Sequence, residues 1–252
     1  MPRRHAMHRR RVCRLPENIL HVPQDYPTIQ AALDAATDCD IVQIAAGTYA
    51  EEGDKNLQLH GLDVCVVGNG TGLNNSTIIE CGGEGRAFFF PDGVSAAGRV
   101  QNLIIRNGAA DQGGAIYIGE GAHPDIVGVH FDSNHAADDG GAIYIGPNST
   151  ALQAKITSCE FDLNQAGSDG GAVFTDQATP TIAFCVFDDN TAGSRGGAMF
   201  NRDGDFNGAR RFDECCFFGS SAGGDGGAVY FIGGSAHFEE CDFIHNHSDD
   251  DG

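Results

Sequence analysis

The stretch Gly113-Gly114-Ala115-Ile116-Tyr117 decides the fold of this chain, because it returns at regular intervals. Each return keeps the two glycines and the alanine, followed by an aliphatic or Met residue and then an aromatic one. The first glycines of the five copies are 27, 30, 26 and 30 residues apart. The later copies occupy residues 140–144, 170–174, 196–200 and 226–230. A period of this size predicts a repeat architecture in which each unit stacks on its neighbours.

A second set of residues keeps fixed distances from the glycines. A Phe stands nine residues before the first glycine, a Cys or Val two residues before that Phe, and an Asn or Ser three residues after it. The stretch 104–107 fits the same frame and adds an earlier Asn. The residues predicted to form structural ladders are Phe131, Phe161, Phe187, Phe217, Phe243, Cys159, Cys185, Cys215, Cys241, Asn107, Asn134, Asn164, Asn190 and Asn246.

Short apolar segments bounded by Gly, Asn, Asp and Pro predict an all-β fold. The segments are four to six residues long and rich in Ile, Val, Phe and Tyr, which is typical of strands joined by turns. Cys159 and Phe161 share strand parity but Ile156 does not, so a bend is expected between Ile156 and Cys159. A coil of 26 to 30 residues with two or three such strands predicts a parallel β-helix. Each coil would pair with the next through its backbone and advance about 4.8 Å.

Stacking of equivalent positions explains the residue choices. The Phe series would stack rings inside the core, and the Asn series would occupy a left-handed bend with its amides bonded from coil to coil. The paired glycines would permit a tight corner. The Cys series behaves as a column of small buried thiols, although neighbouring coils are close enough for disulfides. Cysteine usage therefore leaves the redox compartment open.

The chain divides into a basic arm and one solenoid. Residues 1–18 hold six arginines and are expected to be disordered. Residues 19–252 form the β-helix, with a cap at 19–52, irregular coils at 53–108 and regular repeats at 109–252. In the cap, Thr28 is a suitable N-cap for a short amphipathic helix, followed by a strand at 41–44 and a turn at 47–51. The last repeat breaks off at Gly252, so we expect a C-terminal end that continues in a longer chain or is covered by another chain.

Composition argues against two classes of function. The chain carries 35 Asp and Glu against 15 Lys and Arg, a net charge of −20. An acidic body of this kind would repel nucleic acid. No run of 18 apolar residues predicts a membrane span, and no apolar segment follows the N-terminal arginines as in a secretory signal.

The opening segment and the repeats resemble known families. Val22-Pro23 to Glu52, with Gly47-x-Tyr49-x-Glu51, is similar to the N-terminal cap of pectin-lyase-like β-helices. The Gly-Gly-Ala-Ile and Phe-x-x-Asn pair resembles the repeats of chlamydial polymorphic outer-membrane proteins. This resemblance covers roughly residues 19–252 and implies a single-stranded right-handed parallel β-helix with a short N-terminal capping helix. It also implies an extracellular or cell-surface location, whereas the function differs widely among proteins of this fold.

The residue before each glycine pair is the strongest candidate for chemistry. It reads Gln112, Asp139, Asp169, Arg195 and Asp225 along the repeats. One interpretation is that Arg195 relieves repulsion among stacked carboxylates. Another resembles pectate lyases, in which carboxylates bind Ca²⁺ and an Arg abstracts a proton beside a uronate carboxylate. Asp139, Asp169 and Asp225 are then the Ca²⁺ candidates, Arg195 is the catalytic candidate, and its pKa would have to be strongly depressed.

The sequence therefore predicts a cell-surface scaffold or adhesin-like protein that contacts carbohydrate or a partner surface through an exposed face. The alternative is a polysaccharide lyase or another carbohydrate-active enzyme of the same fold, with Ca²⁺ as the candidate cofactor. Apart from that ion, no cofactor is expected. An enzyme would need a coil that departs from the repeat and carries a distinct polar cluster. The irregular segments 51–99 and 202–208 contain no evident acid, base and electrophile set.

Overall fold

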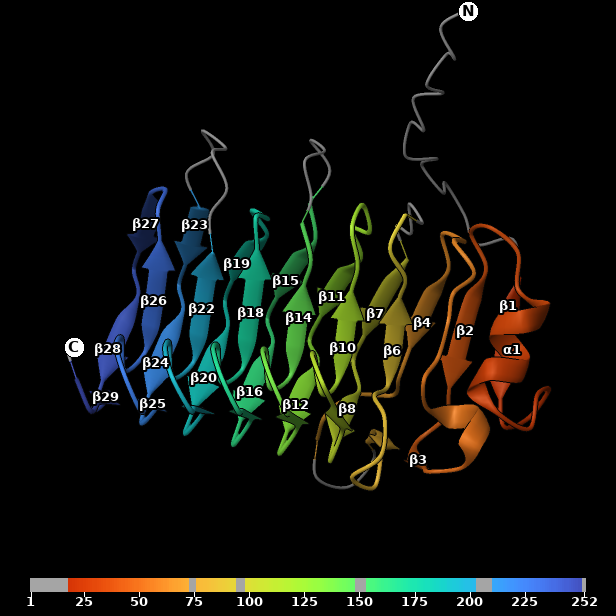
Figure 1. The fold of residues 1–252 in the computed structure, drawn as a ribbon. Helices are drawn as coiled ribbons and strands as arrows, with labels where there is room; N and C mark the ends of the chain where they lie inside the picture. The colour runs from red at the N-terminus through yellow and green to blue at the C-terminus, as the bar shows by residue number, and fades with distance from the viewer. Residues whose placement is uncertain (1–17, 73–75, 94–97, 148–152, 203–209, 251–252) are drawn as a thin grey trace, which may run out of the picture.

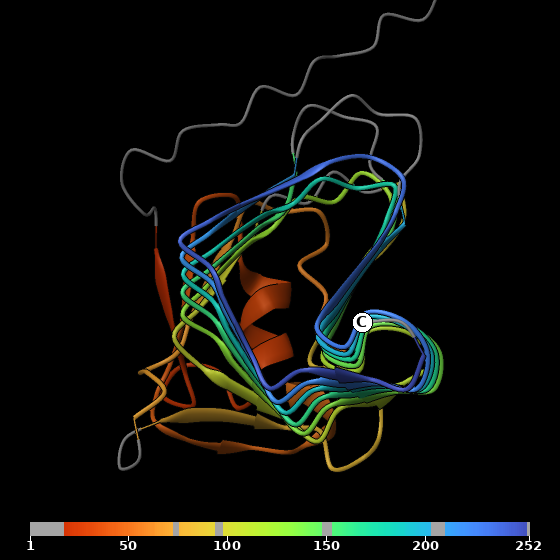
Figure 2. The same ribbon diagram turned by 90° about the vertical axis from the view of Figure 1, so that its left-hand side faces the viewer.

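The protein is a right-handed parallel β-helix with one short helix at its N-terminal end (Figures 1 and 2). The computed structural model describes residues 18–72, 76–93, 98–147, 153–202 and 210–250. Seen from the C-terminal end in Figure 2, the coils superpose as a stack that advances toward the viewer. The expected all-β fold is confirmed, while the predicted arm falls almost wholly outside the described residues.

Four parallel sheets run along the axis, and each regular coil contributes one strand to each of them. We number the sheets in the order in which a coil visits them. Sheet 1 holds β1 (Ile19–Val22), β2 (Ile41–Ile44), β4 (Cys65–Val67), β7 (Arg99–Gln101), β11 (Asp125–Val127), β15 (Lys155–Thr157), β19 (Thr181–Ala183), β23 (Arg210–Asp213) and β27 (Ala236–Glu239). Sheet 2 holds β3 (Gly47–Tyr49), β5 (Thr77–Glu80), β8 (Ile104–Arg106), β12 (His130–Asp132), β16 (Glu160–Asp162), β20 (Val186–Asp188), β24 (Cys216–Phe218) and β28 (Asp242–Ile244).

The other two sheets complete the coil. Sheet 3 is made of two-residue strands: β9 (Ala109–Ala110), β13 (His135–Ala136), β17 (Gln165–Ala166), β21 (Thr191–Ala192), β25 (Ser221–Ala222) and β29 (His247–Ser248). Sheet 4 holds β6 (Phe88–Phe90), β10 (Ile116–Ile118), β14 (Ile143–Ile145), β18 (Val173–Asp176), β22 (Met199–Arg202) and β26 (Val229–Ile232). The glycine repeat is thus the corner that leads into sheet 4, at the front of Figure 1.

Equivalent motif positions stack in register along the axis. Phe131 pairs with Phe161, Phe161 with Phe187, and Phe187 with Phe217 in sheet 2. Their ring centroids are 4.7 to 4.8 Å apart and the rings are nearly parallel. These spacings match the separation of hydrogen-bonded strands. The predicted bend after Ile156 is also present, since β15 ends at Thr157 and Ser158 has a φ of +54°.

The two glycines of each corner are required for different reasons. The first has a φ between +60° and +68° in all five copies, a region that disfavours side chains. The second lies against the next coil: a Cβ at Gly171 would stand 2.0 Å from the carbonyl oxygen of Gly197. The same contact is 2.0 Å for Gly141 and 2.1 Å for Gly197. Any side chain at the second position would push two coils apart.

One expectation about the bend after sheet 2 is wrong. The residue in the left-handed region is not the ladder Asn but the residue before it, such as Ser133 or Leu163, with φ near +55°. The left-handed residue points outward, as the 58% exposure of Leu163 shows. The Asn that follows is turned inward and is buried. The inward position selects Asn for its amide and not for its tolerance of the left-handed conformation.

A short cap covers the N-terminal end. Helix α1 (Ile29–Ala35) begins after Thr28, whose side chain accepts a hydrogen bond from the backbone N–H of Ala31. Its buried face carries Ile29, Ala32 and Leu33. The carboxylate of Asp54, in the short helix η1 (Glu52–Asp54), accepts from the N–H of Ile29. α1 is far too short to cross a membrane, and no other α-helix lies in the described segments.

The segment expected as a turn at 47–51 is partly a strand. Gly47–Tyr49 forms β3 and pairs in parallel with Thr77–Ile79 of β5. The reason is that sheet 2 starts inside the cap, so this segment already lies beside the first full coil. The buried Tyr49 hydroxyl donates to the carbonyls of Val22 and Ala45 and ties the cap to sheet 1.

We expect Gly171→Ala to destabilise the protein by about 3 kcal/mol, because the added methyl group overlaps backbone of the next coil. Gly72→Ala is the matched control, since nothing lies within 4 Å of a Cβ there. Its urea midpoint should equal that of the unmodified protein within experimental error. The measurement is urea unfolding followed by circular dichroism. Equal midpoints for the two variants would show that close coil contact at the corner does not limit stability.

Candidate functional site

An aromatic column lies on the outward side of sheet 4. In β14, Ile143 and Ile145 face the core while Tyr144 faces away from it, and the other coils repeat this alternation. Successive ring centroids are 5.1 to 5.8 Å apart. The column consists of Phe89, Tyr117, Tyr144, Phe174, Phe200 and Tyr230. It is a second apolar cluster, separate from the interior of the solenoid.

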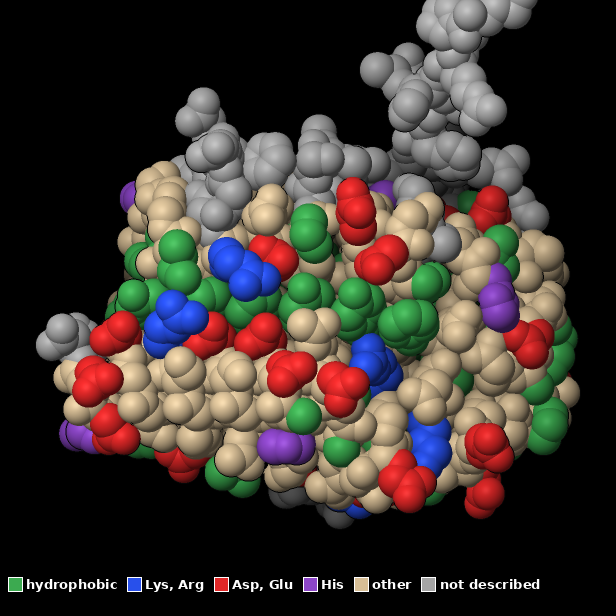
Figure 3. Space-filling view, in the orientation of Figure 1, with side chains coloured by type: hydrophobic (Ala, Val, Ile, Leu, Met, Phe, Trp, Pro, Cys, Tyr) green, Lys and Arg blue, Asp and Glu red, His purple; other side chains and the backbone are tan. Residues whose placement is uncertain are grey.

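Arginines cover much of this column. The guanidinium carbon of Arg195 lies 4.9 Å from the ring centre of Phe200, and that of Arg202 lies 5.3 Å from that of Phe174. At the other end Arg86 lies over Tyr117 at 5.2 Å. Guanidinium groups at these distances stabilise the rings by cation–π attraction. Figure 3 shows the apolar row over sheet 4 with basic and acidic side chains along it.

Arg195, the catalytic candidate, is held in an ion pair with Asp169. Its Nε and Nη2 atoms donate to the two carboxylate oxygens at 3.2 and 2.8 Å. The hydrogen bonds and charge of Asp169 raise the pKa of Arg195 above its usual range. A proton-abstracting arginine requires the opposite shift. The structure therefore gives the lyase hypothesis no support at this residue.

The aspartates before the glycine pair act on the backbone. The carboxylate of Asp139 accepts from the N–H of Asp169, and that of Asp169 accepts from the N–H of Arg195. Each carboxylate therefore reaches toward the following coil, so Asp169 is directed at Arg195. Among the described residues, the His, Cys, Asp and Glu donors close enough to share an ion do not include Asp139, Asp169 or Asp225. Calcium binding at this corner stays a prediction.

A second ion pair of the same kind, between Arg202 and Asp176, was not expected from the sequence. Arg202 donates from Nε and Nη2 to the carboxylate of Asp176 at 3.0 and 2.9 Å, and this pairing raises the pKa of Arg202. Asp176 and Arg202 each stand two positions after an aromatic residue of the column, and they are 26 residues apart. This spacing could have predicted the ion pair, because residues one repeat apart become direct neighbours in the sheet.

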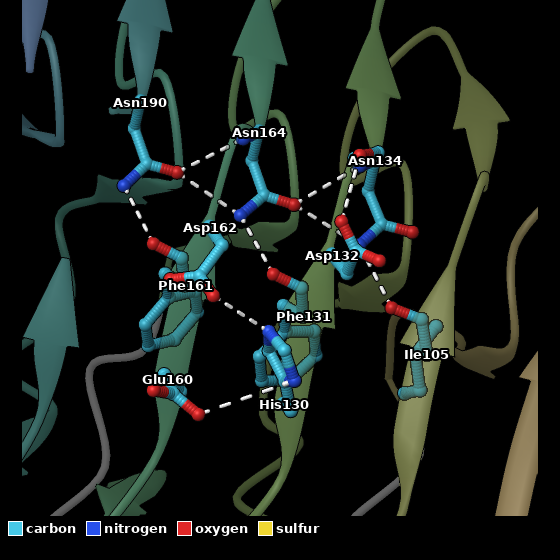
Figure 4. A network of polar contacts seen from close by, with 11 residues as sticks. Ile105, His130, Phe131, Asp132, Asn134, Glu160, Phe161, Asp162, Asn164 and Asn190 are labelled. Carbon is cyan, nitrogen blue, oxygen red and sulfur yellow. Dashed lines mark hydrogen bonds and ion pairs between the residues drawn. The ribbon is translucent and has the colours of Figure 1, made fainter. Parts of the chain in front are cut away.

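The Asn ladder runs through the bend between sheets 2 and 3 (Figure 4). The side-chain oxygen of Asn164 accepts from both the backbone and the side-chain nitrogen of Asn134, at 3.1 and 3.0 Å. Its Nδ2 donates to Asn190 Oδ1 and to the carbonyl of Phe131, both at 3.0 Å. Asn134, Asn164 and Asn190 are at most 1% exposed. The network satisfies buried backbone N–H groups in the bend, such as that of Asn134, that no strand pairs with.

Asn107 does not belong to this ladder, contrary to the sequence prediction. Asp132 pairs with Arg106, so Asn134 lies beside Gly108, whose N–H donates to Asn134 Oδ1. Asn107 instead occupies the left-handed position and donates to Glu80. The prediction failed because the turn after Ala110 is one residue shorter than in later coils. Counting back from Gly113 therefore placed the frame one residue too early.

The Cys column is closed to solvent in its middle. The Sγ atoms of Cys159, Cys185 and Cys215 are directed at backbone carbonyls, at 3.3 to 3.8 Å. Burial raises the pKa of the Cys185 thiol far above its usual range. Such thiols are weak nucleophiles. All four column cysteines, including Cys241, are free thiols.

An exposed apolar patch lies on the outward side of sheet 2 and its preceding bend. Phe184, Val186 and Phe218 are 53%, 41% and 39% exposed, and Cys216 is the register partner of Val186. We call these four residues the apolar patch. A hollow of about 340 Å³ opens beside it, and Glu214, Glu240 and Asp242 contribute to its lining. Exposed apolar side chains from neighbouring coils are typical of a contact surface.

Comparison with known proteins gives one match. Residues 128–146 match the family model described as the Chlamydia polymorphic membrane protein (Chlamydia_PMP) repeat. This segment contains β12, β13 and β14. No curated protein and no solved structure matches the chain. The repeat match and the parallel solenoid together suggest a surface-protein scaffold, while similarity to pectin-lyase-like proteins finds no support in these comparisons.

Replacing the central ladder residue, Asn164→Leu, should lower the free energy of unfolding by about 3 kcal/mol. The substitution leaves the N–H of Asn134 buried without a partner and removes the Asn164 side-chain hydrogen bonds to Phe131 and Asn190, and an unsatisfied buried group alone costs about 1–3 kcal/mol. Asn107→Gly is the control, because it removes an exposed Asn outside the ladder and suits a positive φ. Both are measured by urea unfolding. A loss for Asn107→Gly as large as that for Asn164→Leu would contradict the ladder assignment.

Proposed function

We propose that this protein is an adhesin-like scaffold of the cell surface or extracellular space that binds a protein partner through the apolar patch on sheet 2. The observation that carries the proposal is the exposure of Phe184, Val186 and Phe218 on neighbouring coils of a rigid face. Solenoids use such repeated faces as extended binding surfaces. The match to a membrane-protein repeat supports the location.

The charges around the patch favour a particular partner. Glu214, Glu240 and Asp242 border the apolar side chains, and the chain as a whole has a net charge of −20. Acidic polysaccharides would be repelled by this surface, whereas a protein surface with apolar and basic residues is complementary to it. The partner is therefore expected to present an apolar centre with Lys or Arg at its border.

The column cysteines do not argue against the proposed location, because Cys159, Cys185 and Cys215 are buried in the core and hidden from oxidants.

The patch predicts a specific loss of binding. Labelled protein should bind saturably to intact cells of at least one type in a panel, and Val186→Asp with Phe218→Asp should weaken this binding at least tenfold. The reason is that two apolar side chains that become buried on binding are replaced by carboxylates, which lose their hydration at a high cost in free energy. Binding is measured by flow cytometry, before and after protease treatment of the cells.

Leu163→Asp is the matched control, because Leu163 is 58% exposed on sheet 2's other bend and lies outside the patch. It should bind like the unmodified protein. Binding that survives protease but not glycan removal would replace the protein partner with a carbohydrate. Equal binding by the double variant would exclude the patch as the contact.

The enzyme alternative is tested directly by incubation with a panel of acidic polysaccharides, with and without Ca²⁺. We expect no ultraviolet-absorbing unsaturated product, because the raised pKa of Arg195 keeps it protonated. Arg195→Lys serves as a comparison, since a product formed by the unmodified protein and abolished in this variant would establish the lyase.

A further inference from the structure

We propose that His130, Glu160 and Asp162 form a binding site for a divalent transition-metal ion, best suited to Zn²⁺, on the outward face of sheet 2. One ligand atom from each residue lies within 4.8 Å of the other two. The site is distinct from the apolar patch and from the calcium candidates at the glycine corner. It is independent of the proposed function.

The β-helix itself brings the three side chains together. His130 in β12 pairs directly with Glu160 in β16, and Asp162 stands two residues after Glu160 on the same face. Figure 4 shows the imidazole between the two carboxylates. Its Nε2 lies 2.8 Å from Asp162 Oδ2, and its Nδ1 lies 4.0 Å from Glu160 Oε2. All three side chains remain accessible from solvent, with exposures of 22%, 54% and 28%.

The donor set fits zinc in number and chemistry. Zn²⁺ is bound by imidazole nitrogen and carboxylate oxygen at about 2.0–2.2 Å, in a tetrahedron whose ligand atoms stand about 3.4 Å apart. The separations between the ligand atoms need to change by at most about 1.4 Å to reach that geometry. Glu160 is the most exposed of the three and has the freedom to rotate inward. Three protein ligands leave the fourth position for water, as in open zinc sites.

The surrounding charge favours a cation. Asp132 faces the imidazole from its own strand, and Asp188 is the register partner of Asp162 on the next coil. On the other side β8 presents Ile104 and Arg106, and Arg106 is paired with Glu80. Two carboxylates, those of Glu160 and Asp162, lie within 4.0 Å of the imidazole.

A second observation, at Asp188, also favours a bound cation. The Oδ1 atom of Asp188 is shielded from solvent and has no hydrogen-bond partner. A divalent ion beside Asp162, the register partner of Asp188, would attract this carboxylate as well.

The test uses the whole chain of residues 1–252, freed of metal with a chelator. Titration with Zn²⁺ alone by isothermal calorimetry should give a saturable site, and His130→Gln should weaken it at least tenfold. Glu160→Gln, at an exposed position that the fold does not need, should also weaken it. His135→Gln, in the neighbouring strand β13, is the control and should leave the affinity unchanged.

A second measurement locates the ion. Co²⁺, used as a paramagnetic substitute, should broaden the imidazole resonances of His130 before those of His135, with His130 assigned from the spectrum of His130→Gln. Either of two results would overturn the proposal. One is equal affinity of the unmodified protein and both ligand variants, with folded variants shown by circular dichroism. The other is broadening that begins at other histidines.

Discussion

Backbone hydrogen bonding between successive coils is the constraint on which the rest of this structure depends. Every strand pairs in parallel with the equivalent strand one coil away, from β1 to β29. Such pairing is possible only if equivalent residues of neighbouring coils lie at the separation of paired strands. Side chains at equivalent positions of successive coils must therefore stack on one another, so each position must hold a residue type that packs well against the same residue type. Phe rings, thiols and Asn amides all do, in different ways.

The same constraint separates scaffold positions from positions free to carry function. Inward positions are fixed by packing and by the need to satisfy backbone groups, as the ladder of Asn134, Asn164 and Asn190 shows. Outward positions are not bound by these needs, so their character changes along the axis. Sheet 2 presents imidazole and carboxylates around β12 and β16, and apolar side chains around β20 and β24. Its outward face is therefore where both a metal ion and a partner are proposed to bind.

Charge in this protein is arranged by stacking as well. A column of carboxylates along a parallel solenoid repels itself over short distances, since partly buried pairs are screened only weakly by salt. Arg195 interrupts such a column, whereas Arg202 pairs with the single carboxylate of Asp176, and each arginine also lies over an aromatic ring. The arginines thus neutralise charge and seal the aromatic column at once. This dual contact makes a structural role a sufficient explanation for Arg195.

The sequence by itself determined the coil, the corner glycines, the bend between sheets 1 and 2 and the core columns, because a fixed period imposes a fixed stacking. It misplaced Asn107, since a turn one residue shorter shifts the frame without any mark in the local sequence. Only the tertiary structure decided which outward side chains meet. Arg195 joins Asp169 because carboxylates at that corner reach toward the following coil. His130 meets Asp162 diagonally across two strands. The period fixes which residues are neighbours, but the direction in which each side chain turns depends on the three-dimensional surroundings of its own coil.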